Sequence, residues 1–369
     1  MATEQRGDII VVDDDVGEPS IDIIYLVLAI LTGACRSLKP IWIVPFRTRK
    51  SRRLLDRIDP TLNICVRFRS STTASLTSSV MKYQYENGRR YHRYQEGRYL
   101  LPNDEKEQHH MDILEHMFKL ILSGKLYLAP ISSEIERILD IGTGTGGWVI
   151  DMAELFPDAH LIGNDLSPIQ PRMVPPNVSF EVDDAENEWT YSQPFDFIHC
   201  RYMATSIRDW PLLFSRVFKN LKPEGWAEFY DFDLIYKSDD GSLTKDHELY
   251  INSAQTCAAA EKLGQPSCPG PQLKGWAVDA GFTNVEEFVF KIPIGPWAKD
   301  PKLKEIGAWN QIQSLEGNEG WSMALLTRVM GWTPEKVREH LVRLRAEYRD
   351  TSIHAYITAF VVFGQKPKN

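Results

Sequence analysis

The segment LDIGTGTGG, Leu139 to Gly147, decides the fold of this chain of 369 residues. Its glycines follow the apolar run RILDI and precede WVIDMAEL, so they lie between a predicted strand and a predicted helix. Gly142, Gly144 and Gly146 let the backbone pass close to a ligand. This context predicts a binding loop of an α/β domain rather than a plain turn.

Apolar segments and helical patterns alternate outward from this loop. Strands are predicted at 137–141, 159–163, 178–182, 195–199 and 226–230, and helices at 148–155 and 211–221. Two further strands are predicted at 285–292 and 355–363, the second closing the sheet as an antiparallel strand. Strands that alternate with helices predict a doubly wound, Rossmann-like α/β fold with a seven-stranded sheet.

Two helical regions flank this alternation. Asn103 is a predicted N-cap, and Met111, Leu114 and Phe118 then recur at helical spacing. Residues 296–350, between the last two strands, are too many for an ordinary connection and predict a helical cap inserted into the domain.

The glycine loop has two interpretations. Gly142, Gly144 and Gly147 satisfy G-x-G-x-x-G, the fingerprint of dinucleotide sites, so an NAD-dependent oxidoreductase is one candidate. Asp140 argues against it, because a carboxylate before the loop is unfavourable beside a pyrophosphate. S-adenosylmethionine (SAM) has no phosphate and carries a cationic ammonium and sulfonium, which a carboxylate suits.

Acidic residues follow the next two predicted strands. Asp165 ends the second strand, where it can accept hydrogen bonds from ribose hydroxyls. Asp183 and Asp184 end the third, near the expected adenine edge. Asp165 alone would also fit an NAD enzyme, but together with Asp140 the set favours SAM.

Five stretches show a resemblance to a known family: YENGRRYHRYQEGRYLLPNDEKEQ, LDIGTGTGGWVIDMAELFP, IGNDLSPIQPRMVPPNVSFEVDDAENEW, FDFIHCRYM and LKPEGWAEFYDFD. From about Tyr83 to Pro367 the chain resembles the fungal LaeA-like methyltransferases, a class I SAM-dependent family. The resemblance implies SAM as the cofactor. The residues expected to contact it are Asp140, Gly142, Thr143, Gly144, Gly146, Asp165, Leu166, Asp183, Asp184, Ala185, His199, Cys200 and Arg201.

Methyl transfer from a sulfonium depends mainly on aligning the acceptor with the methyl group. Where the acceptor must lose a proton, His199 at the end of the fourth strand is the candidate base. The alternative, a structural histidine at a strand end, remains open. The segment WSMALLTRVMGW, Trp321 to Trp332, leads us to expect that the cap selects the acceptor.

Two functions remain open at this stage. The first is a SAM-dependent methyltransferase that acts on a small-molecule acceptor, a secondary metabolite by family resemblance. The second is a regulator of secondary metabolism that keeps the methyltransferase fold and acts through protein partners.

Composition limits the partners and the compartment. The net charge of -8 and pI near 5.7 argue against a nucleic-acid binder. Five cysteines without a C-x-x-C pair favour a reducing, intracellular location, cytoplasm or nucleus, and no metal site is expected. The apolar run Ile23 to Cys35 is too short to span a bilayer, so no membrane partner is expected.

The first 80 residues differ in composition from the rest. They run acidic, apolar, basic and then Ser/Thr-rich, and include the basic cluster RTRKSRR, Arg47 to Arg53. This pattern predicts a poorly ordered tail at 1–80, followed by a methyltransferase domain at 81–369. Deletion of residues 1–75 is therefore expected to leave stability and SAM affinity nearly unchanged.

Overall fold

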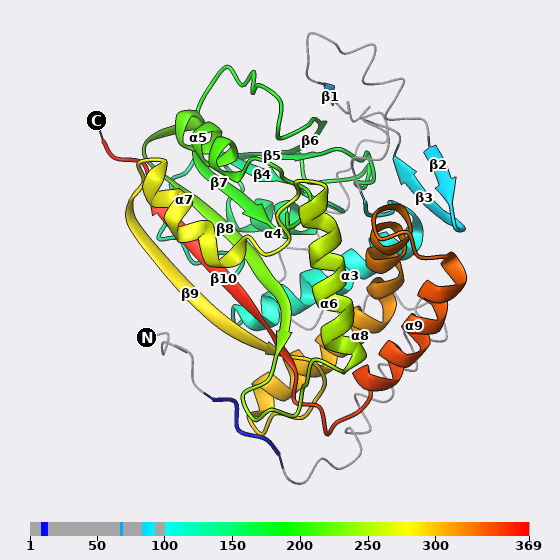
Figure 1. Ribbon diagram of the computed structural model, residues 1–369. Helices are drawn as coiled ribbons and strands as arrows, with labels where there is room; N and C mark the ends of the chain where they lie inside the picture. The colour runs from blue at the N-terminus through cyan, green and yellow to red at the C-terminus, as the bar shows by residue number, and fades with distance from the viewer. Residues whose placement is uncertain (1–8, 14–66, 69–82, 93–99, 369) are drawn as a thin grey trace, which may run out of the picture. The chain divides into compact units, whose positions relative to one another are not determined.

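The computed structural model describes residues 9–13, 67–68, 83–92 and 100–368 (Figure 1). Its main sheet has the strand order β1-β6-β5-β4-β7-β8-β10-β9. The strands are β1 (Arg67–Phe68), β4 (Arg137–Ile141), β5 (His160–Asp165), β6 (Val178–Val182), β7 (Phe195–Arg201), β8 (Leu221–Lys237), β9 (Thr283–Pro293) and β10 (Tyr356–Gln365). Apart from the two-residue β1, these are the seven predicted strands. A separate hairpin joins β2 (Tyr83–Glu86) and β3 (Arg89–His92).

Successive residues of β4 face opposite sides of the sheet and enter two hydrophobic cores. Leu139 packs in a core that includes α5 (Trp210–Asn220) and α7 (Leu273–Asp279). Ile138 packs in another core that includes α4 (Gly147–Leu155). Helices therefore cover both faces of the sheet, which confirms the doubly wound fold.

The antiparallel closure and the helical insert are also confirmed. β10 pairs antiparallel with both β8 and β9. Between β9 and β10 lie α8 (Pro301–Ala324), the π-helical turn η5 (Leu325–Val329) and α9 (Pro334–Tyr348). In Figure 1, α8 lies against α3 (Glu105–Ile121) and α9 against α6 (Glu248–Lys262). The insert thus forms a cap with helices from elsewhere in the chain.

Several predicted boundaries were wrong. The N-cap of α3 is Asp104 rather than Asn103, because the Asp104 side chain accepts the hydrogen bond from the Glu107 N–H. β8 is much longer than the predicted 226–230, since β10 pairs with it as far as Lys237. α6, α7 and the short η4 (Gly270–Gln272) occupy a part of the chain for which no element was predicted.

The predicted tail lies mostly outside the described residues, so its boundary at residue 80 stays a prediction. The segment Ile9–Asp13 is described, and it contacts the start of the insert. Val12 forms an antiparallel bridge with Ala298, and Ile10 is buried beside Trp297. Within the described parts of the chain, no helix is long and apolar enough to cross a membrane. The apolar run at 23–35 lies outside those parts.

Candidate functional site

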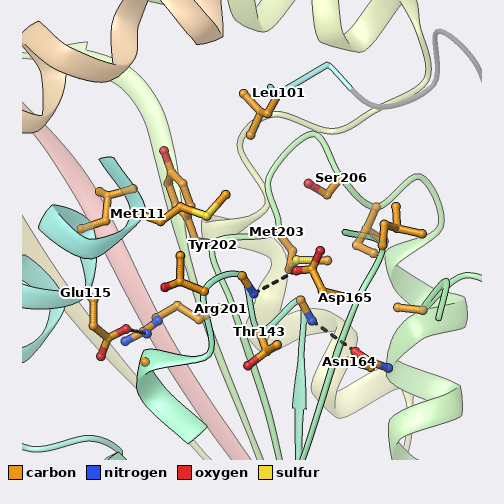
Figure 2. Close-up of a pocket in the computed structure, with 18 of the residues that line it drawn as sticks. Leu101, Met111, Glu115, Thr143, Asn164, Asp165, Arg201, Tyr202, Met203 and Ser206 are labelled. Atoms are coloured by element: carbon orange, nitrogen blue, oxygen red, sulfur yellow. Dashed lines mark hydrogen bonds and ion pairs between the residues drawn. The ribbon is translucent and has the colours of Figure 1, made fainter. Parts of the chain in front are cut away.

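The carboxyl ends of β4, β5, β6 and β7 open into a cavity that α3 covers, here called the first cavity (Figure 2). Its empty volume is about 990 Å³, part of it open to solvent. Sites for small molecules typically measure about 300–1,000 Å³, so this cavity can hold a ligand of cofactor size. Its position at the carboxyl edge of parallel strands is where doubly wound folds bind ligands.

The glycine loop forms the floor of the cavity in a shape that side chains would block. Gly142 has a φ of +66°, and a Cβ there would lie 2.2 Å from Sδ of Met203. Gly146, the N-cap of α4, has a φ of +83°, and a Cβ there would lie 2.4 Å from Cζ of Phe180. Gly142 and Gly144 line the cavity, whereas Phe180 fills the space beside Gly146; close approach of the loop to a ligand stays a prediction.

Asp165 joins the end of β5 to this loop. Its Oδ2 accepts a hydrogen bond from the Gly144 N–H at 2.9 Å (Figure 2). Its Oδ1 accepts one from the Ser167 N–H at 2.8 Å. Burial, with a smaller contribution from the negative charge of Asp140, raises the Asp165 pKa to about 6. Each carboxylate oxygen has a second lone pair, so Asp165 can still accept hydrogen bonds from a ligand.

The charges that line the cavity are mostly negative. Arg201 is the one cationic side chain among the described lining residues; it is ion-paired with Glu115 and lies 4.3 Å from the centre of the Phe118 ring. Five lining residues carry carboxylates: Glu107, Glu115, Asp165, Asp183 and Asp184. This excess suits a cationic ligand such as SAM and opposes a pyrophosphate.

Comparison with known proteins agrees with this chemistry. A family model described as "Methyltransferase domain" matches residues 113–287. "Methyltransferase pytC" of Aspergillus terreus is 44% identical over 298 residues, covering 80% of this chain and 92% of its own. The chain belongs to the fungal LaeA-like class I methyltransferase family. It is a SAM-dependent methyltransferase, which removes the oxidoreductase alternative.

Another relative is named as a regulator, and a further one as a protein methyltransferase. "Secondary metabolism regulator LAE1" of Cochliobolus heterostrophus is 36% identical over 290 residues, covering 77% of this chain and 94% of its own. "Protein-methionine methyltransferase laeA" of Emericella nidulans is 32% identical over 296 residues, covering 79% of each chain. The family thus contains proteins named as enzymes and proteins named as regulators.

The fold brings most of the predicted site residues of this methyltransferase together. Nine of them line the first cavity: Gly142, Thr143, Gly144, Asp165, Leu166, Asp183, Asp184, Ala185 and Arg201. Four do not line it: Asp140, Gly146, His199 and Cys200. Contact of any of them with the cofactor stays a prediction.

Asp140 and His199 form a buried pair below the cavity. Nδ1 of His199 lies 2.7 Å from Oδ1 of Asp140, and the ring stacks on Trp148 with centroids 3.9 Å apart. His199 is 1% exposed and Asp140 4%. A base must reach the proton that it removes. This geometry therefore favours the structural interpretation of His199 that the sequence analysis left open.

α3 contributes lining residues that the sequence analysis did not assign to the site: Glu107, Met111, Leu114, Glu115 and Phe118. Their helical spacing was visible in the sequence, but an apolar helix face predicts core packing. Tyr202 and Met203, which follow β7, also line the cavity. Within the described residues, no group of three or more His, Cys, Asp or Glu is placed to hold a metal ion.

Proposed function

We propose that this methyltransferase binds SAM in the first cavity and methylates a small-molecule acceptor, a secondary metabolite. The observation that carries the proposal is the acidic, glycine-floored cavity at the strand ends of a chain in this family. When bound, SAM supplies a methyl group that its sulfonium already activates. The protein must then hold the cofactor, admit the acceptor and exclude water.

The lining residues suit the parts of SAM one by one. Asp165 can accept hydrogen bonds from the ribose hydroxyls, and Asp183 and Asp184 lie where the adenine edge is expected. The Gly142–Gly144 backbone can approach the amino-acid end of the cofactor. Arg201, held by its ion pair, suits the carboxylate at that end.

The test is methyl transfer from labelled SAM to an extract of fungal metabolites. We expect label to appear in a discrete small molecule, and heat-denatured protein should transfer none. The absence of transfer to any extract, together with no measurable SAM binding, would overturn the proposal.

A second candidate is a regulator that keeps the SAM pocket and acts through protein partners. The relatives named as secondary metabolism regulators favour it. The discriminating experiment is affinity purification of the tagged chain, followed by a methylation assay of whatever co-purifies. A stable partner that takes up label, with no label in metabolites, would favour the regulator.

We infer that the protein works in the cytoplasm or the nucleus. The odd cysteine count and the basic cluster Arg47 to Arg53 support this inference. Fluorescence of the tagged protein, with and without neutral residues in place of that cluster, would distinguish the two compartments.

A further inference from the structure

A second cavity adjoins the first. Residues of α3, β8, α6 and α8 line it, and its empty volume is about 740 Å³, part of it open to solvent. It shares Leu101, Glu107, Leu114 and Tyr202 with the first cavity. An acceptor must approach the methyl group from the side opposite the sulfur. A neighbouring cavity with a common boundary offers such an approach.

Four charged residues form a compact group at this boundary. Arg89 donates from Nε to Oδ2 of Asp104 at 2.6 Å and from Nη2 to Oε2 of Glu107 at 3.1 Å. Oε1 of Glu107 lies 2.9 Å from Nδ1 of His110. Arg89, Glu107 and His110 are each less than 10% exposed. With His110 protonated, the group holds two positive and two negative charges, so it is neutral overall.

The hydrogen bonds of His110 indicate that both ring nitrogens carry a proton. Nδ1 faces the Glu107 carboxylate, and Nε2 lies 3.1 Å from Oε1 of Gln313. The other end of Gln313 donates from its Nε2 to Asn310 at 2.6 Å and to Ser314 at 3.0 Å, which orients its oxygen toward His110. Two acceptors facing one imidazole require two N–H donors.

The charged surroundings support this protonation. Burial by itself lowers the pKa of His110, but the hydrogen bond and charge of Glu107, together with the hydrogen bond to Gln313, raise it above the usual value. Arg89, the other charged group that acts on the ring, opposes this rise. The two phenols that line the cavity, Tyr202 and Tyr236, have raised pKa values and stay neutral at pH 7.

α8 is shaped to fit this group. A Cβ on Gly317 would lie 2.3 Å from Nε2 of His110. A Cβ on Gly320, one turn later, would lie 2.9 Å from Oε2 of Glu107. Glycines at these two positions let the backbone of α8 pack directly on the charged side chains of α3. The cap thus holds His110 at the wall of the second cavity.

We propose that the second cavity is the acceptor site and that it takes a small molecule that is already ionised at its nucleophilic oxygen, such as an enolate, an acidic phenolate or a carboxylate, bound to the protonated His110. This inference rests on the proposed function. The acceptor oxygen forms a bond to the methyl carbon while the carbon–sulfur bond breaks and its electron pair stays on sulfur. His110 keeps its proton throughout, and the charges of the anion and the sulfonium cancel.

His110 suits this role by its charge and position. Among the described residues that line the second cavity, it is the one that carries positive charge. An anionic oxygen can take the place of Gln313 as the acceptor for the Nε2–H bond. A charge-assisted hydrogen bond contributes about 1.5–3 kcal/mol, which corresponds to about a tenfold to hundredfold gain in affinity.

The experiment measures binding of two matched probes to the protein saturated with S-adenosylhomocysteine. The anionic probe is 4-hydroxycoumarin, an acidic enol, and the neutral probe is its O-methyl ether, 4-methoxycoumarin. We expect wild type to bind the enol at least about tenfold more tightly at pH 7.5. His110→Gln should reduce that ratio to about threefold or less, whereas His109→Gln, an exposed neighbour on α3, should leave it unchanged.

A second variant keeps the inference testable if His110→Gln does not fold. Gln313→Glu has the same shape, but it places a carboxylate against His110 and should also abolish the preference for the enol. An unchanged preference in either folded variant, or failure of both probes to bind wild type, would overturn the acceptor-site inference. If wild-type protein does not bind S-adenosylhomocysteine, the proposed cofactor site is refuted instead, so the two failures are distinguishable.

Discussion

At the scale of single residues, SAM binding in the proposed site should depend on the ionisation of Asp165. Its pKa, raised to about 6, means that the empty site holds a proton on this carboxyl at mildly acidic pH. Since this pKa lies above the ordinary value of 3.8, Asp165 also lowers the stability of the empty protein as pH rises from 3.8 to about 6. Binding that requires the carboxylate must then weaken below pH 6.

We therefore predict that SAM affinity is constant above about pH 7 and falls by up to about tenfold per pH unit below pH 6. Asp165→Asn should weaken binding at pH 8 by about 1–3 kcal/mol and flatten this dependence, because it removes the charge-assisted hydrogen bonds. Calorimetry at several pH values measures both effects. The exposed Asp158→Asn is the control, and wild-type affinity in Asp165→Asn would remove Asp165 from the site.

Asp165 lines the first cavity and His199 does not, and the reason is their position along the strands. Asp140 and His199 are paired in the register of β4 and β7, so their side chains meet on one face of the sheet. Arg201 lies two residues further along β7, on the same face, and lines the cavity. The sequence predicts the strand but not which of its last residues reach the cavity.

At the scale of elements, the approach of α8 to the strand that precedes it depends on glycine. A Cβ on Gly307 would lie 2.1 Å from the carbonyl oxygen of Gly295, a backbone atom that cannot move aside alone. Gly307→Ala should therefore destabilise the protein by about 1–3 kcal/mol. Gly275→Ala on α7, where nothing lies within 4 Å, should be neutral or stabilising by up to about 1 kcal/mol. Thermal unfolding of the two variants tests this, and equal melting temperatures would contradict it.

Two residues of the insert allow acceptor binding to be tested apart from packing. Trp321 and Met330 both pack against the cluster that contains Leu100 and Leu325, but Trp321 also lines the second cavity and Met330 does not. Trp321→Ala should change acceptor binding at least about tenfold while SAM affinity stays within about threefold. Met330→Ala should lower the melting temperature and leave acceptor binding nearly intact. Parallel loss of SAM binding, acceptor binding and folding in Trp321→Ala would show that the residue is only structural.

Element-scale features were predictable where they were local. The glycine loop, the strands and the length of the insert follow from periodicity and spacing, and the structure confirmed the seven strands and the helical insert. The spacing of Gly317 and Gly320 carried a signal too. This signal could be interpreted only once α3 was known to lie opposite α8. A glycine pair on a helix indicates close packing but does not indicate which element packs there.

At the scale of the whole molecule, contacts between distant parts of the chain escaped the sequence analysis. The N–H of Asp13 donates to the carbonyl of Trp297 at 2.9 Å, and the N–H of Lys299 donates to that of Val11 at 2.8 Å. Asp13 also forms an ion pair with Lys304. The segment 9–13 is too short to show a periodic pattern of apolar residues. The expectation that it could be deleted without effect therefore rested on composition alone.

Ile10 is the residue through which this segment should contribute stability. It is 8% exposed and packs with Trp297, Ala298 and Tyr356, whereas its neighbour Ile9 is 75% exposed. Ile10→Ala should cost about 1–3 kcal/mol, less than a deep core site because the segment can shift to fill the space. For a chain of this size, that lowers the melting temperature by about 1–2 °C per kcal/mol. Ile9→Ala should change it by less than one degree or so, since its side chain is already in water. Equal melting temperatures for both variants and wild type would show that residues 9–13 do not stabilise the domain, as the composition led us to expect. A lower melting temperature in Ile10→Ala alone would show that the stable domain includes residues ahead of residue 80.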